Sequence, residues 1–195
     1  LLFHLGCAVD DCARNRAQLQ LFRDAVQRVP HRQASLANSA GIALGSEYAF
    51  DITRPGLALY GGVPRSELGS HIKPVASIQA AVLQVREVQA GDAIGYTGEF
   101  VAHGPMRVAT VSLGYADGFL RSRGKDGVVI ADGNRCPILG KVSMDMIVID
   151  LANAPDLATG DWVNAPLDLP YAAQQSSVSQ YELLTTHGGR LRPSA

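Results

Sequence analysis

The sequence of 195 residues predicts a two-part protein, an α/β segment followed by a mainly-β domain. Two observations lead to this fold class. From residue 1 to about residue 62, short apolar runs alternate with a helical pattern, which is typical of a parallel sheet covered by helices. From about residue 75, apolar runs recur at roughly ten-residue intervals between glycine-containing turns, which is typical of a small antiparallel barrel or sandwich.

The first segment contains one clear helical pattern. In residues 15–29 the apolar positions mostly recur at three- and four-residue steps, and Pro30 ends the pattern. Residues 1–8 predict a buried parallel strand, and the short apolar runs 34–37, 50–53 and 57–60 predict further strands around a short helix. We expect the polar residues between these runs to lie at strand C-terminal ends, where α/β sheets and barrels bind their ligands.

A polar stretch with Gly, Ser and Pro, residues 64–73, is the predicted linker. It separates a first domain, residues 1–65, from a second domain, residues 70–195. Strands of the second domain are predicted at 75–88, 107–112, 128–131, 137–142, 146–151 and 160–163. Residues 167–186 predict one or two helices, with Ser176, Ser177 or Ser179 as possible caps.

Composition narrows the class of protein. With 47% apolar and 18% charged residues the chain can bury a core, and a net charge of −1 argues against a nucleic-acid or membrane partner. The three cysteines match no zinc or C-x-x-C spacing, so we expect free thiols and a cytoplasmic protein. No apolar run approaches the roughly 20 residues of a spanning helix. The chain lacks an initiator methionine, and we expect it to start within a longer protein.

Four motifs carry candidate chemistry: Asn38-Ser-Ala-Gly41, Arg54-Pro-Gly-Leu-Ala-Leu-Tyr-Gly61, Gly114-Tyr-Ala-Asp-Gly118 and Gly140-Lys-Val-Ser-Met-Asp145. Each also has an ordinary structural explanation. Asn38 and Ser39 are typical helix caps, Arg54 is typical of a surface salt bridge, and Tyr115 is typical of a packed ring. Small polar residues at a helix start can equally bind a phosphate group.

Together and in this order, the four motifs resemble the C-terminal half of a bacterial alanine racemase, a pyridoxal phosphate (PLP) enzyme. The resemblance covers residues 1 to about 192 and implies the last strands of a (β/α)8 TIM barrel followed by a β-rich domain. It also implies that Ser39, Gly56, Leu57 and Tyr181 hold the phosphate of PLP, with Asn38 beside them. Arg54 would donate a hydrogen bond to the pyridine nitrogen and keep that nitrogen unprotonated.

The resemblance further implies that Tyr115 is one of two opposed bases, and that it acts across the interface of a homodimer. A free tyrosine has a pKa near 10 and is a poor base unless a cationic network assists it; His4 and Arg54 are the candidates for that network. A histidine on an apolar strand is otherwise more often a satisfied core residue. Met144 and Asp145 are implied substrate contacts, although a methionine is as often a core gap-filler. Lys141 stands where many members of the family have an arginine. A lysine keeps the charge but lacks the bidentate guanidinium, so the resemblance does not imply a gating role for Lys141.

The family's Schiff-base lysine has no counterpart here, since Lys73, Lys125 and Lys141 all lie in other contexts. We therefore expect the intact enzyme to interconvert L-alanine and D-alanine through a PLP aldimine, and this chain alone to be inactive. Two alternatives stay open. One is a non-enzymatic dimerisation or binding module with a decayed site, and the other is a PLP-dependent racemase of another amino acid.

Overall fold

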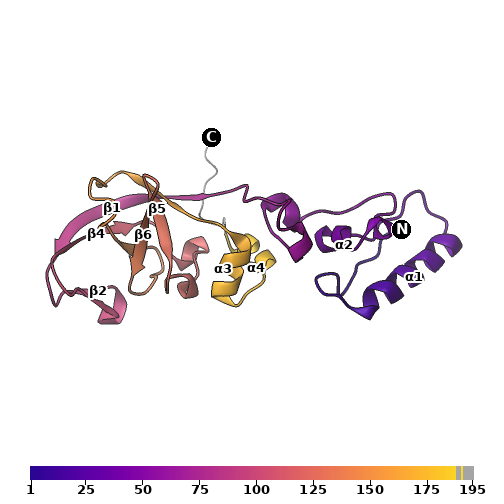
Figure 1. The fold of residues 1–195 in the computed structure, drawn as a ribbon, viewed down its shortest axis with the longest axis horizontal. Coiled ribbons are helices and arrows are strands. Elements are labelled where there is room, and N and C mark those ends of the chain that lie inside the picture. Colours follow the sequence, from indigo (N-terminus) through magenta and orange to yellow (C-terminus); the bar gives the residue numbers. More distant parts are fainter. Residues whose placement is uncertain (188–189, 191–195) are drawn as a thin grey trace. The chain divides into compact units, whose positions relative to one another are not determined.

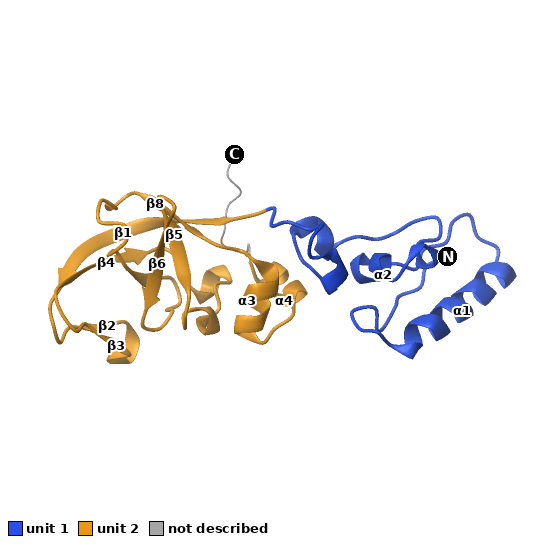
Figure 2. Ribbon diagram, in the orientation of Figure 1, with its two compact units in different colours: residues 1–75 blue, residues 76–195 orange. Residues whose placement is uncertain are grey.

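A computed structural model describes residues 1–187 and 190 of the chain. The chain divides into two compact units, residues 1–75 and residues 76–195 (Figure 2), and each is described by itself. The end of the predicted second domain, residues 191–195, lies outside the described residues.

Unit 1 is built around one long helix, α1 (Ala13–Arg28), close to the predicted span (Figure 1). Leu19 and Phe22 form its buried face because they lie three residues apart. The Phe22 ring meets Phe50 edge to face, with 4.7 Å between the ring centroids. The core of unit 1 collects Leu5, Ala8, Leu19, Phe22, Ala34, Leu36, Ala37, Ala40 and Tyr48.

The strands predicted in unit 1 are reduced to single bridges. Leu2 pairs with Ser35 and Asn38 with Arg54, both in parallel, while Ser35 pairs with Phe50 in antiparallel. The prediction of a buried strand at residues 1–8 is wrong, since Leu2 is 63% exposed. A parallel ladder needs pairing along its length, and single bridges do not supply it. The two parallel bridges agree with an α/β arrangement, but the structure does not show a barrel here.

The run Leu57–Tyr60 is not a strand either. It forms the 3-10 helix η2, and Gly61 ends it in a left-handed conformation with φ 84°. Unit 1 also contains α2 (Ser39–Ala43), η1 (Ser46–Tyr48) and η3 (Ser66–Leu68). A four-residue apolar run does not distinguish a strand from a helical turn, which explains the wrong assignment.

Unit 2 is a closed antiparallel barrel, in agreement with the predicted mainly-β domain. Its strand order is β1-β4-β7-β6-β5-β8, and the separate hairpin β2-β3 completes the β structure. The bounds are β1 (Ile78–Val88), β2 (Ala93–Ile94), β3 (Phe100–Val101), β4 (Met106–Val111), β5 (Val128–Ala131), β6 (Asn134–Leu139), β7 (Ile147–Asp150) and β8 (Trp162–Ala165). Short 3-10 helices η4 (Tyr96–Gly98), η5 (Tyr115–Asp117) and η6 (Arg121–Arg123) lie in the connections.

The long strand β1 closes the barrel by pairing with two partners. Its first residues, 78–81, pair with β8, and its later residues, 82–88, pair with β4 across an irregularity between Val82 and Gln84. The main core therefore fills the barrel interior, while a second cluster of Val88, Ile94, Ala102, Val108 and Leu139 packs under the β2-β3 hairpin.

Two helices follow the barrel, α3 (Leu169–Ser176) and α4 (Gln180–Thr186). Ser179 caps α4, as predicted, and forms a capping box with Glu182. Ser176 and Ser177 end α3 instead of starting a helix. In the part of the chain that the structure describes, no helix has both the length and the apolar character needed to cross a membrane.

Candidate functional site

In unit 1, the Ser39 side chain binds backbone amides of residues 56–58, a segment distant in the sequence. Its hydroxyl oxygen accepts hydrogen bonds from the amides of Gly56, at 3.0 Å, and Ala58, at 3.2 Å. Ser39 is only 1% exposed, so this pairing satisfies its oxygen away from water. The hydroxyl hydrogen remains available to an acceptor, and a side-chain carbon at Gly56 would meet no atom within 4 Å. A hydroxyl that two amides hold in place beside an open space suits a phosphate group.

Asn38 has the structural role that sequence reasoning considered for it. Its side-chain oxygen accepts the amide hydrogen of Gly41 at 2.9 Å, so it caps α2. A Cβ on Gly41 would approach Leu5 at 2.9 Å, which explains why glycine stands there. Asn38 therefore supports the turn that carries Ser39.

The Arg54 guanidinium is held by neutral oxygens and not by a carboxylate. It donates to the hydroxyl of Ser35 at 2.5 Å and to the carbonyls of Phe3 at 2.9 Å and Leu36 at 3.3 Å. Among the described residues Arg54 forms no ion pair, so the surface salt bridge is not observed. A cation fixed by uncharged partners keeps its full charge for a ligand.

His4 differs from both descriptions considered for it. The residue is exposed, so it is not a satisfied core histidine. Its backbone carbonyl accepts from Gln18 at 3.4 Å, but within residues 1–187 and 190 its ring has no hydrogen bond to Arg54. The contact expected between the two is made instead by the neighbouring carbonyl of Phe3.

In unit 2, the two motifs around Tyr115 and Met144 are joined through their backbones. The amide of Tyr115 donates to the carbonyl of Ser143 at 3.1 Å, and the amide of Ala116 donates to the carbonyl of Met144 at 3.0 Å. Gly114 allows this approach, since a Cβ there would lie 2.2 Å from the Met144 oxygen. Met144 is 52% exposed and is not a core gap-filler.

Charged side chains surround these two loops. The Arg121 guanidinium carbon lies 4.9 Å from the centroid of the Tyr115 ring, a cation–π contact. Arg190 pairs with Asp145 at 2.6 Å and with Asp117 at 3.6 Å. The predicted substrate contact Asp145 is therefore already engaged by an arginine.

A second tyrosine, Tyr96, lies outside the motifs that the sequence analysis singled out. It is 66% exposed and begins η4 after Gly95, and the next residue, Thr97, has the strained value φ 63°. The ammonium of Lys141 donates to the Thr97 hydroxyl at 3.1 Å and lies 3.9 Å from Glu99. Backbone strain collects at functional sites. In the sequence, the feature that marks Tyr96 is its position between Gly95 and Gly98 in a short hairpin.

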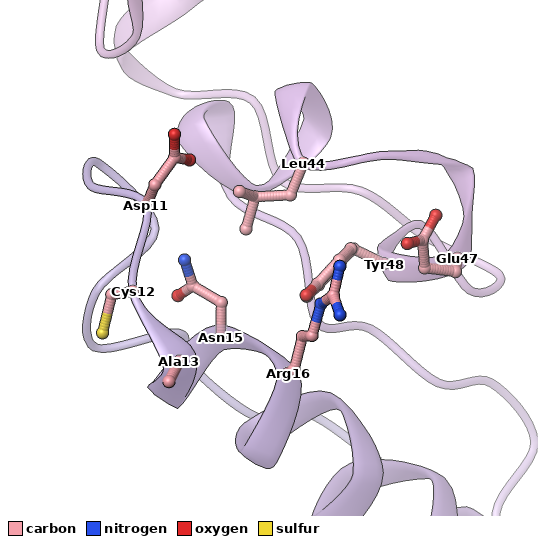
Figure 3. Close-up of a pocket in the computed structure, with 8 residues that line it drawn as sticks. All are labelled: Asp11, Cys12, Ala13, Asn15, Arg16, Leu44, Glu47 and Tyr48. Atoms are coloured by element: carbon pink, nitrogen blue, oxygen red, sulfur yellow. The ribbon is translucent and has the colours of Figure 1, made fainter.

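The predicted residues therefore fall into two groups. His4, Asn38, Ser39, Arg54, Gly56 and Leu57 lie in unit 1, and Tyr115, Met144, Asp145 and Tyr181 lie in unit 2. Tyr181 is 48% exposed on α4. A depression of about 470 Å³ in unit 1, lined by residues of α1 and η1, contains none of them (Figure 3). Within the described residues, no three His, Cys, Asp or Glu side chains gather as a metal site requires.

The chain matches two protein families side by side. Residues 1–64 match the alanine racemase N-terminal domain and residues 75–194 match the alanine racemase C-terminal domain. The catabolic alanine racemase of Agrobacterium fabrum is 40% identical over 200 residues, covering 100% of this chain and 52% of that protein. The alanine racemase of Methylobacterium nodulans is 41% identical, covering 97% of this chain and 53% of that protein.

Solved structures give the same result. A structure of alanine racemase from Bartonella henselae with covalently bound pyridoxal phosphate has a TM-score of 0.82 at 38% identity, covering 98% of this chain and 55% of that one. The alanine racemase of Acinetobacter baumannii has a TM-score of 0.82 at 34% identity, over 97% of this chain and 55% of that one. The chain spans about half the length of the relatives it matches.

Proposed function

This chain belongs to the alanine racemase family, and from that premise we propose that the intact enzyme interconverts L-alanine and D-alanine with PLP as cofactor. The observation that supports this most directly is the cradle of Ser39 with the amides of Gly56 and Ala58, held next to the fixed cation Arg54. PLP, when bound, withdraws electrons from the Cα of the amino acid and so acidifies its proton.

Each residue of unit 1 then has a definite task. Ser39 donates its hydroxyl hydrogen to the phosphate group, while the amides of Gly56 and Ala58 donate to the Ser39 oxygen and hold that hydroxyl in place. Leu57, between these two residues, is the second backbone contact that we propose for the phosphate. Arg54 donates to the ring nitrogen, and because a guanidinium stays protonated in proteins it does not pass a proton on. The chain contains three lysines, of which only Lys73 is in unit 1, and that residue is exposed. We assign the covalent lysine to a part of the enzyme outside these 195 residues.

Unit 2 supplies a phenol that moves the Cα proton on one face of the amino acid. From the Gly-Tyr-Ala-Asp-Gly motif, which resembles that of the family, we propose Tyr115 for this role. Tyr96, which is 66% exposed, is a second candidate, whereas Tyr115 is partly buried and its ring faces the cation Arg121. A base must reach the proton that it abstracts. Exposure alone does not identify a base, and the Tyr115 motif docks on the loop that carries Ser143 and Met144. We therefore place Tyr115 first and Tyr96 second.

The test compares Tyr96→Phe and Tyr115→Phe in the intact enzyme, with Tyr171→Phe as the control at another exposed tyrosine. The change removes only a hydroxyl, so folding and cofactor absorbance should survive in all three. Racemisation should fall by about 10²–10⁴ in the variant that lacks the base. That variant should also lose deuterium exchange at Cα from one alanine enantiomer far more than from the other. Equal, small losses in Tyr96→Phe and Tyr115→Phe would exclude both of these phenols as the base.

We further propose that the phenol serves the partner's site in a homodimer. Mixing subunits that lack the phenol with subunits that lack the covalent lysine tests this, because only mixed dimers can then assemble one complete site. Activity should appear on mixing. If mass spectrometry shows mixed dimers and no activity appears, the phenol and the lysine of one site belong to the same subunit.

The identity of the substrate is a separate question. Assaying the intact enzyme with a panel of amino acids answers it.

A further inference from the structure

The backbone that follows helix α4 packs against the Tyr115 loop. Helix α4 ends at Thr186, and a Cβ on Gly118 would lie 2.7 Å from the Thr186 carbonyl oxygen and 2.9 Å from the His187 Cα. Gly118 ends the turn that carries Tyr115 and has φ 91°, a conformation that favours glycine. A third segment of unit 2 therefore lies directly on the loop that carries the proposed base.

Arg190, on this third segment, binds the carboxylates of two loops. Its Nη1 donates to Oδ1 of Asp145 at 2.6 Å, and its Nε lies 3.6 Å from Oδ1 of Asp117. The other oxygen of Asp117, Oδ2, accepts the amide hydrogen of Gly114 at 2.9 Å. Asp117 is thus engaged on both of its oxygens, at a side chain that is only 12% exposed. One guanidinium links the turn of Asp117 with the loop of Asp145.

The charge of Arg190 matters as well as its reach. Among the described residues it is the only cation that forms an ion pair with either carboxylate. Removing it would leave Asp117 without a countercharge and with little hydration. Asp145 is half-exposed and follows Met144, the proposed substrate contact. The amino acid brings a carboxylate of its own, and like charges repel each other. A guanidinium on Asp145 therefore removes a repulsion at the site.

We propose that Arg190 is a positioning residue, which holds the Tyr115 and Met144 loops in one arrangement and neutralises the carboxylate beside the substrate contact. The inference rests on the proposed function, because it takes Tyr115 as the base and an amino acid as the substrate. Arg190 acts through Asp117 and Asp145. It moves no proton itself, since a guanidinium stays protonated in proteins.

The first test reads the arrangement of the loops without any activity. In the full chain the amides of Tyr115 and Ala116 donate to the second loop, so their hydrogen exchange, followed by NMR, reports whether the two loops stay together. Arg190→Met should speed exchange at both amides by about threefold to tenfold. The amide of Leu151, hydrogen-bonded elsewhere in the barrel, should be unaffected. Arg86→Met is the matched control, at an exposed arginine without an ion pair among the described residues.

The second test measures racemisation by the intact enzyme. Arg190→Met should raise KM for alanine and lower kcat/KM by about tenfold to 10²-fold, with the cofactor absorbance unchanged. Adding Asp145→Asn to this variant should bring KM back toward the wild-type value, because a neutral amide does not repel the substrate. Arg190→Lys keeps the charge but not the fork, and should fall in between. A loss of stability alone would leave KM unchanged in the folded molecules.

The two tests distinguish a failure of this inference from a failure of the proposed function. An intact wild-type enzyme that does not racemise alanine would overturn the proposed function. An active enzyme whose Arg190→Met variant keeps the wild-type KM, or the wild-type amide exchange at Tyr115 and Ala116, would overturn only the role of Arg190. So would a raised KM that Asp145→Asn does not lower.

Discussion

Replacing Gly114 with alanine should separate the two loops that carry Tyr115 and Met144. The backbone of Gly114, at φ −150°, is one that alanine adopts freely, so the effect is purely one of contact. The added carbon would lie 2.2 Å from the Met144 oxygen and 2.5 Å from the Asp145 amide nitrogen. Both contacts are with backbone, which cannot rotate away as a side chain can. The loop 143–146 must therefore move.

The magnitude follows from what that movement breaks. Overpacking costs about 1–3 kcal/mol, and each of the two backbone hydrogen bonds between the loops contributes about 0.5–1.5 kcal/mol. The free energy of unfolding should fall by about 2–6 kcal/mol, measured by urea denaturation followed by circular dichroism. Gly104→Ala is the matched control, since a Cβ there meets nothing within 4 Å. If Gly114→Ala were as stable as Gly104→Ala, the docking of the two loops would contribute little to unit 2.

Four further changes test the charges and hydrogen bonds. Arg65→Met should lower the free energy of unfolding by about 1–3 kcal/mol in denaturant titrations, because it removes two ion pairs and leaves a buried carbonyl unpaired. Arg123→Met should be neutral or stabilising in the same titration, since burial without a carboxylate partner lowers the pKa of Arg123 to about 10. Burial lowers the pKa of His187, so the folded state binds fewer protons than the unfolded state; thermal stability should fall as the pH drops below about 6.5, and His187→Gln should remove that decline. Ser39→Ala should cost about 1–3 kcal/mol by leaving two amides unpaired, and should weaken PLP binding by the intact enzyme in fluorescence titrations.

Local patterns predicted the β domain well because the forces that shape it are partly local. In β5 (Val128–Ala131) the predicted and observed bounds coincide, since buried and half-buried residues alternate and an Asp-Gly turn follows. Ser179 was predicted as a possible cap from its residue type alone, since a short hydroxyl side chain satisfies a free helix amide. The same reasoning failed at Leu57–Tyr60, where four apolar residues fit either a strand or a helical turn.

The sequence by itself determined the order and chemical character of the motifs, and through them the family. Residue types and spacing are sufficient for that, because the chemistry of a serine, an arginine or a tyrosine is the same in any fold. Only the tertiary structure decided which of these groups meet. The Ser39 hydroxyl accepts from the amide of Gly56, and the Tyr115 loop docks on Met144. Such contacts depend on how the barrel closes and on side chains that hold a loop in place, as Arg65 does. They arise from packing over the whole unit, and no local pattern contains them.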